Sequence, residues 1–137
     1  ANQPMEQENT VLTYNGEIYN YRQLKEKFFN KRTQFYSRSD SEVLLKLWNL
    51  RNEKALSELD GMFAFAIFKN KKLSLAVDPF GEKPLYYFQD NNGVYFSSEI
   101  DSLRAICDFG IRSDKEFISE FLFFGYINSP YTAFEGV

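Results

Sequence analysis

The sequence predicts an α+β fold, in which helices lie against antiparallel strands. Apolar residues follow helical spacing in two early segments, 18–28 and 39–50. The spacing then changes, because the run 62–69 is almost wholly apolar, as in a strand that is covered on both faces. Short strand-like segments and turns follow it, which indicates an antiparallel meander. The predicted order is strand and helix twice, then the meander, then further helices.

The segment LTYNGEIYNY (12–21) contains the first strand-to-helix transition. Residues 10–14 are β-branched and aromatic, which predicts a strand. Asn15-Gly16 is a frequent turn pair, and the apolar residues of 18–28 have helical spacing. We therefore expect a bend between strand and helix here. A hairpin turn of type I′ is disfavoured, because its second arm would need strand spacing.

The segment SRSDSEV (37–43) carries the start signal of the second helix. Ser39 and Glu42, three residues apart, match a capping box, and Asp40 places negative charge at the positive end of the helix. The predicted buried stripe of this helix consists of Val43, Leu44, Leu47 and Leu50.

The remaining elements follow from the same signals. Asn92-Gly93 indicates a hairpin turn, and Gly125 ends a helix that begins at Ser113 or Asp114. The other predicted strands are 33–37, 62–69, 72–77, 85–89 and 94–98, and the other predicted helices are 53–59, 99–107 and 113–125.

The composition restricts the function classes. A chain of 137 residues is expected to form one domain. Its net charge of -3, from 16 basic and 19 acidic residues, argues against a nucleic-acid partner. No apolar run has the roughly 18 residues of a membrane span, and no segment resembles a signal peptide. The single cysteine, Cys107, fits a reducing compartment, so we expect a cytoplasmic protein.

The chain contains no histidine, which excludes Ser-His-Asp and Cys-His catalysis within it and zinc sites built on histidine. It also contains no Walker loop and no GxGxxG motif. Its chemistry must therefore use carboxylates, amides, backbone N–H groups or a nucleophile from elsewhere. The first residues, ANQPMEQENT, have no initiator Met, and we expect the chain to be an excised fragment.

Five segments, in this order and spacing, resemble a known family: TYNGEIYNYRQLKEKF, SRSDSEVLLKLW, LDGMFAFAIF, DPFGEKPLYY and VYFSSEIDSLRAI. They are similar to the class-II glutamine amidotransferase domain of asparagine synthetases. NQPM near the start and EFLFFGYINSPYTAFEGV at the end are similar to that family's flanks, so the resemblance covers essentially the whole chain.

The resemblance implies an N-terminal-nucleophile hydrolase fold, an α/β/β/α sandwich of antiparallel sheets that is incomplete at its N-terminus. In that family the first residue of the mature enzyme is a cysteine whose thiolate attacks glutamine, with its own α-amino group as base. Residue 1 here is Ala. We therefore expect 1–137 to be a partial amidotransferase domain without its nucleophile, with a flank 113–137 that leads toward a missing synthetase domain.

Asn15 and Gly16 are the candidate catalytic residues. Attack on a carboxamide moves negative charge onto oxygen, and fixed donors aimed at that oxygen stabilise it. The resemblance implies that the Asn15 amide and the Gly16 N–H form this oxyanion hole. From the residues themselves, a turn and an oxyanion hole both remain open.

Gly16, Glu17 and Asp40 are the candidate binding residues for glutamine. The resemblance implies that the carboxylates of Glu17 and Asp40 hold its α-amino group, since charge-assisted hydrogen bonds are stronger than neutral ones. Gly16 and Glu17 would also line the pocket with their backbones. Asp40 has an alternative role as a helix-capping residue, and the two roles can coexist.

Other polar residues have ordinary structural interpretations. Cys107 is expected to be a buried structural thiol, and Glu99 a charge at a helix start. Asp78 and Glu82 flank PFG, where solvated turn charges are favoured over a catalytic carboxylate pair. Val77 and Pro79 depart from the family, which usually has an arginine before the Asp and a basic or aromatic residue after it. The Phe-rich run 116–126 is expected to be core or an interface with the missing domain.

The resemblance thus implies the glutaminase part of an asparagine synthetase, which hydrolyses glutamine and supplies ammonia for ATP-dependent amidation of aspartate. No metal or cofactor is expected in this fragment, whereas ATP and Mg are implied for the missing synthetase domain. The expected partners are glutamine and that domain, and association of identical chains is left open. The alternatives are a relative that acts on another carboxylate, such as a sugar acid of a surface polysaccharide, and a catalytically silent interaction module.

Overall fold

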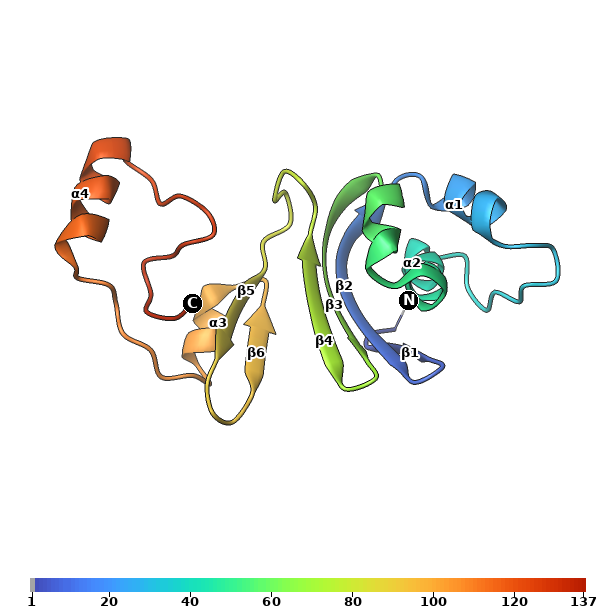
Figure 1. The fold of residues 1–137 in the computed structure, drawn as a ribbon, viewed down its shortest axis with the longest axis horizontal. Coiled ribbons are helices and arrows are strands. Elements are labelled where there is room, and N and C mark those ends of the chain that lie inside the picture. Colours follow the sequence, from blue (N-terminus) through green and yellow to red (C-terminus); the bar gives the residue numbers. More distant parts are fainter. Residues whose placement is uncertain (1) are drawn as a thin grey trace. The chain divides into compact units, whose positions relative to one another are not determined.

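The computed structural model describes residues 2–137, so Ala1, where the thiol is expected to be missing, lies outside them. Contacts divide the chain after Pro84 into two compact units (Figure 1). We call residues up to Pro84 the first unit and Leu85–Val137 the second unit, and each is described by itself.

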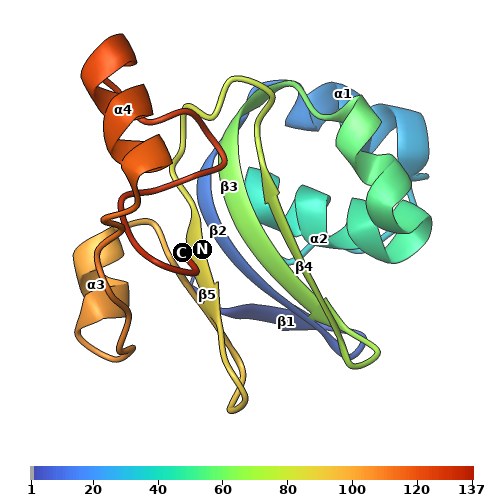
Figure 2. The same cartoon turned by 60° about the vertical axis from the view of Figure 1, so that its left-hand side comes forward.

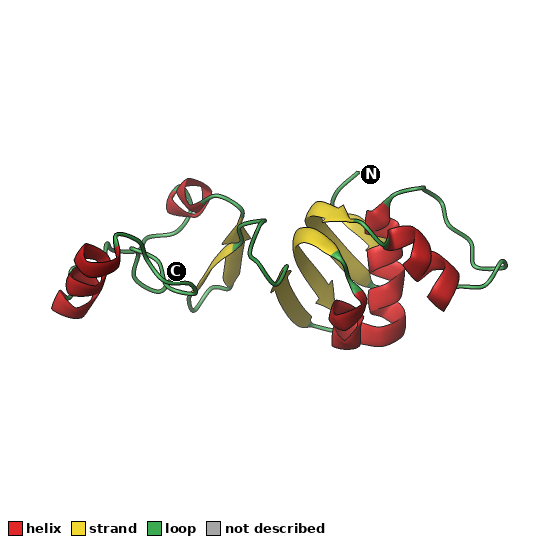
Figure 3. Cartoon of the chain, turned by 90° about the horizontal axis from the view of Figure 1, so that it is seen from above, coloured by secondary structure: helices red, strands yellow, loops and turns green. Residues whose placement is uncertain are grey.

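The first unit is a four-stranded antiparallel sheet with helices on one face. The helices α1 and α2 lie on the same side of the sheet in both Figure 2 and Figure 3. The sheet has the strand order β1-β2-β3-β4. Its strands are β1 (Met5–Gln7), β2 (Thr10–Ile18), β3 (Gly61–Lys69) and β4 (Lys72–Val77), and its helices are α1 (Tyr21–Phe28), α2 (Asp40–Arg51) and the 3-10 helix η1 (Asn52–Glu58).

Strand β2 corrects the expected bend at Asn15-Gly16. It pairs with β3 along its whole length, from Thr10 opposite Lys69 to Ile18 opposite Gly61. This long-range pairing overrides the local turn preference, so the strand continues through both residues and α1 begins at Tyr21. The short strand β1 was not predicted.

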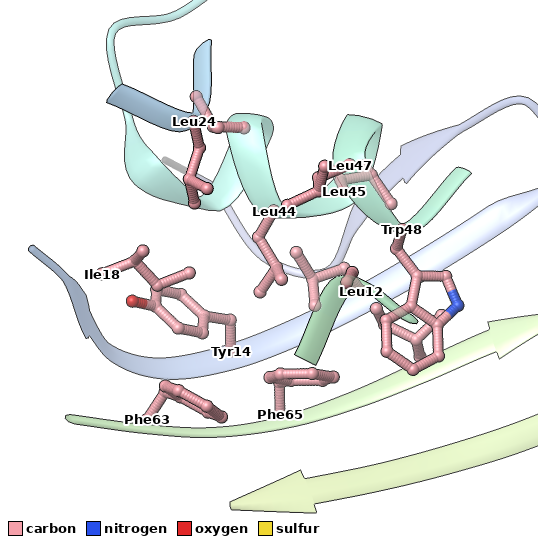
Figure 4. Packing of buried hydrophobic residues seen from close by; sticks show 13 residues of the cluster. Leu12, Tyr14, Ile18, Leu24, Leu44, Leu45, Leu47, Trp48, Phe63 and Phe65 are labelled. Carbon is pink, nitrogen blue, oxygen red and sulfur yellow. The ribbon is translucent and has the colours of Figure 1, made fainter. Parts of the chain in front are cut away.

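The core of the first unit lies between α2 and the sheet (Figure 4). Leu12, Tyr14 and Ile18 of β2 point toward α2, and the ring of Trp48 packs edge-on against Phe65 at a centroid distance of 5.6 Å. The predicted buried stripe of α2 is confirmed at Val43, Leu44 and Leu47. The prediction for Leu50 is wrong, because this residue is 57% exposed. Helix α2 buries Leu45 and Trp48 instead, and its last turn directs Leu50 outward.

Of the two hydrogen bonds of the predicted capping box, the start of α2 confirms the one accepted by the Ser39 side chain. The Ser39 side chain accepts a hydrogen bond from the Glu42 N–H at 3.3 Å. The Glu42 carboxylate, however, accepts from the N–H groups of Tyr36 at 2.9 Å and Ser37 at 2.6 Å. These N–H groups are therefore used by a side chain, and the predicted strand 33–37 is a loop.

The second unit contains a hairpin and two helices. Its elements are β5 (Tyr86–Gln89), β6 (Val94–Ser97), α3 (Ile100–Arg104) and α4 (Lys115–Phe124). Asp114 caps α4 by accepting from the Phe117 N–H at 2.8 Å, and Gly125 ends it at φ 74°, both as predicted. Across residues 2–137, none of the helices is both long and apolar enough to cross a membrane.

Candidate functional site

The candidate site lies along one edge of β2. In the described residues, β1 pairs with β2 only from Thr10 to Leu12, so the edge of β2 from Thr13 to Ile18 carries no paired strand. The side-chain amide of Gln3 substitutes for a strand at Tyr14, since its Oε1 accepts from the Tyr14 N–H at 2.6 Å and its Nε2 donates to the Tyr14 carbonyl.

The backbone of Gly16 faces the same edge. Its partner on β3 is Phe63, whose N–H donates to the Asp78 carboxylate and whose carbonyl accepts from the Asp78 N–H at 2.8 Å. Both polar groups of Phe63 thus point away from β2, which makes Gly16 and Phe63 a non-hydrogen-bonded pair of the antiparallel ladder. The N–H of Gly16 is consequently directed toward the edge that Gln3 partly covers.

Asp40 reaches this edge from the first turn of α2. Its Oδ2 accepts from the Ile18 N–H at 3.0 Å and from the Tyr14 hydroxyl at 2.6 Å. Its Oδ1 accepts from the Ser41 N–H at 2.8 Å. Ser39 caps the helix, which leaves the Asp40 carboxylate to join the helix start to the strand.

The edge therefore combines a backbone donor with a carboxylate. Gly16 and Ile18 are two residues apart on β2, which corresponds to about 6.6 Å along the strand. An oxyanion would be stabilised by the donor and an ammonium by the carboxylate.

Asn15 and Glu17 point to the other face of the sheet. Successive side chains of a strand alternate between faces, and Tyr14 and Ile18 point toward α2 (Figure 4). Asn15 and Glu17 are therefore on the face away from α1 and α2, and both are exposed. Neither side chain forms a hydrogen bond with another described residue. The structure thus brings Gly16 and Asp40 to one edge, whereas the side chains of Asn15 and Glu17 leave β2 on the face opposite the helix that carries Asp40.

Asp78 is neither a solvated turn charge nor half of a carboxylate pair. It is 2% exposed, and its carboxylate accepts from the N–H groups of Phe63, Phe80, Glu82 and Lys83. Glu82 contributes its backbone to this arrangement and its side chain is exposed. The four donors explain why an aspartate follows β4, because the N–H of Phe63 in β3 and the three loop N–H groups would otherwise lack this partner.

The two buried carboxyls of the first unit have lowered pKa values. Burial acts to raise the pKa of Asp78, but the four backbone N–H donors outweigh it, and the net effect is a pKa below the ordinary value. Burial also acts to raise the pKa of Glu42. The hydrogen bonds from Tyr36 and Ser37, together with the nearby charge of Lys46, outweigh burial, so the pKa of Glu42 is lowered overall. Both groups are held ionised by the fold.

We expect the free energy of unfolding to decrease in acid for this reason. A carboxyl with a lowered folded pKa contributes stability that is fully present above its unfolded pKa, about 4, and is lost as the pH falls through the folded value. Urea unfolding should give constant stability from about pH 7 to 5.5 and a decline below about pH 4. Asp78→Asn should reduce stability at neutral pH by about 2 kcal/mol and flatten the acid decline. An equally steep decline in that variant would contradict the assignment.

The remaining candidates lie in the second unit and do not form a site. Cys107 is half-buried, and burial raises the pKa of its thiol, followed by the charge of Asp90. A raised pKa reduces the thiolate fraction, so it does not fit a nucleophile. Glu99 occupies the cap position of α3 without a side-chain capping bond. Among residues 2–137, His, Cys, Asp and Glu form no group of three that could hold a metal ion.

Two residues of the site were not predicted, Gln3 and Tyr14. Gln3 precedes the first predicted strand, and no local pattern shows that its amide would substitute for a strand. Tyr14 carries a usable signal, because it shares a strand face with Leu12 and Ile18 and its hydroxyl needs a partner when buried.

Comparison with known proteins gives consistent results. The glutamine amidotransferase domain family matches residues 1–137. Asparagine synthetase [glutamine-hydrolyzing] 1 of Bacillus subtilis is 43% identical over 129 residues, which cover 93% of this chain and 20% of that protein. Asparagine synthetase B [glutamine-hydrolyzing] of Escherichia coli is 38% identical over 115 residues, which cover 82% of this chain and 20% of that protein. The chain thus spans about a fifth of the length of these relatives.

A solved structure also matches. It is glutamine phosphoribosylpyrophosphate amidotransferase from B. subtilis, complexed with ADP and GMP, which matches with a TM-score of 0.64 and 30% sequence identity. The match covers 74% of this chain and 25% of the chain in that structure. The α+β class and the amidotransferase fold predicted from the sequence are confirmed by these matches.

Proposed function

This chain belongs to the glutamine amidotransferase domain family, and we propose that its β2 edge binds glutamine for hydrolysis to glutamate and ammonia. The observation that carries the proposal is the pair of groups on that edge: the N–H of Gly16, and the carboxylate of Asp40, which accepts from the N–H of Ile18 two residues, or about 6.6 Å, further along the strand. They match the two ends of glutamine, whose carboxamide oxygen becomes negative during attack and whose α-amino group is positive.

The proposed reaction begins with a cysteine thiolate that attacks the carboxamide carbon. The electron pair of the C=O bond moves onto oxygen, where the Gly16 N–H and the Asn15 amide would donate to it. The carbonyl then re-forms as the C–N bond breaks, and the leaving nitrogen takes a proton from the α-ammonium group of that cysteine and departs as ammonia. Water then hydrolyses the thioester, which releases glutamate and the thiol. Cys107 does not fit the attacking role, so we assign the nucleophile to a cysteine of the full-length protein outside these 137 residues.

The amino end of glutamine would be held by two carboxylates. Asp40 is fixed at the edge, and Glu17 follows Gly16 directly on β2. Glu17 is exposed and does not bond another described residue, so its side chain is free to turn toward a bound ammonium.

The ammonia would be used by a synthetase portion of the full-length protein. The relatives named as glutamine-hydrolysing asparagine synthetases support asparagine formation, and hence aspartate as the acceptor. Binding of ATP and Mg by that portion is proposed from the family resemblance alone. We place the protein in the cytoplasm, because its single cysteine fits a reducing compartment. The likeness to a phosphoribosylpyrophosphate amidotransferase keeps another acceptor as the second candidate.

Glutamate release from glutamine tests the proposal. The full-length protein should hydrolyse glutamine, and Cys107→Ser should leave its turnover number unchanged. The 137-residue chain should show no turnover, because Cys107 is its single thiol and its pKa is raised. Hydrolysis by this chain that disappears in Cys107→Ser would overturn the assignment of the nucleophile, and a full-length protein without glutaminase activity would overturn the function.

A further inference from the structure

The Asp40 carboxylate accepts a hydrogen bond from Tyr14, a residue that is not among the site residues predicted from the sequence. Tyr14 is 8% exposed and lies in the core between β2 and α2 (Figure 4). Its hydroxyl is 2.6 Å from the Asp40 Oδ2. We propose that Tyr14 is a positioning residue that sets the affinity for glutamine through Asp40. This inference rests on the proposed function of the β2 edge.

The hydrogen bonds of Asp40 show how the positioning works. A carboxylate oxygen has room for about two donors, and Oδ2 already accepts from the Tyr14 hydroxyl and from the Ile18 N–H. Oδ1 accepts from the Ser41 N–H at 2.8 Å, with the Ser41 hydroxyl more distant at 3.5 Å. The remaining acceptor capacity is therefore mainly on Oδ1, and Oδ1 is the oxygen offered to an ammonium.

Tyr14 is suited to this role because it is a donor at every physiological pH. Burial, followed by the hydrogen bond to Asp40 and its charge, raises the pKa of the Tyr14 hydroxyl above the ordinary value. The proton thus stays on the hydroxyl. A hydrogen bond to a charged group is among the stronger ones in proteins. Its loss would leave Oδ2 facing the edge of an aromatic ring, with the Ile18 N–H as its remaining donor, and would hold the carboxylate less firmly.

The test is Tyr14→Phe in the full-length protein, measured by steady-state glutaminase kinetics. The phenyl ring fills the same space, so the variant is expected to fold. Because the hydroxyl acts on binding of the amino end, KM for glutamine should rise about tenfold, the factor that corresponds to 1.4 kcal/mol, while kcat stays within about twofold. Tyr21→Phe is the matched control, since the Tyr21 hydroxyl bonds Arg22 and not Asp40, and it should change neither constant.

A double-mutant cycle separates positioning from a general structural effect. In the Asp40→Asn background, Tyr14→Phe should change KM by less than about twofold, because the residue it positions no longer carries charge. Additive effects, or an unchanged KM in active Tyr14→Phe protein, would overturn the inference and leave the proposed function intact. Wild-type protein without glutaminase activity would overturn both.

Discussion

Asn15→Ala is expected to lower kcat for glutamine hydrolysis by about 10²–10³-fold, the usual effect of removing one oxyanion-hole donor. KM for glutamine should change by less than about threefold, because the donor acts on charge that develops only in the transition state. The structure supports this separation. The Asn15 side chain is exposed and bonds no other described residue, so its amide is available to a substrate and the fold does not depend on it.

Two measurements distinguish this effect from a loss of structure. The unfolding midpoint of Asn15→Ala should equal that of the wild type, and Asn91→Ala, which removes an exposed amide from the turn before β6, should leave kcat unchanged. Amide synthesis with an ammonium salt in place of glutamine should also continue in the Asn15→Ala full-length protein. An unchanged turnover number for glutamine would remove Asn15 from the oxyanion hole.

The sequence predicted those elements that short-range signals determine. Ser39 and Asp114 mark helix starts, Gly125 marks a helix end, and each signal depends on residues within four positions of it. The fold class followed from periodicity, and the family resemblance selected Asn15, Gly16, Glu17 and Asp40. These roles stay predictions until the kinetics are measured.

The features that were missed depend on residues that are distant in the sequence. The predicted bend at Asn15-Gly16 was wrong because β2 pairs through both residues with β3, which lies more than forty residues later in the sequence. Asp40 and Tyr14 are 26 positions apart, and no local pattern relates them. The loop 33–37 has the composition of a strand, but the Glu42 carboxylate accepts from the N–H groups of Tyr36 and Ser37. Strand preference is decided by the available pairing partner, which a single segment does not show.

Gly16→Ala is expected to destabilise the first unit strongly. In the non-hydrogen-bonded pair with Phe63 the two backbones approach closely, and a Cβ on Gly16 would lie 2.1 Å from the Met62 carbonyl oxygen and 2.7 Å from the Phe63 Cα. Both contacts are with backbone atoms of β3, which cannot move without opening the sheet. Gly16 also has φ +147°, a conformation that residues with a side chain rarely adopt. The sheet therefore requires a glycine here, independently of the oxyanion role proposed for its N–H.

The matched control is Gly81→Ala. Gly81 also has a positive φ of +65°, but an added Cβ there meets no atom within 4 Å. Gly81→Ala should therefore lower the free energy of unfolding by about 1–2 kcal/mol, which is the conformational penalty by itself. Gly16→Ala adds the overlap with β3 and should cost more than about 3 kcal/mol in urea unfolding. Equal losses in the two variants would show that β2 and β3 do not approach as closely as the register requires. The Gly16 N–H would then have no fixed direction, because the pairing with Phe63 turns it toward the edge.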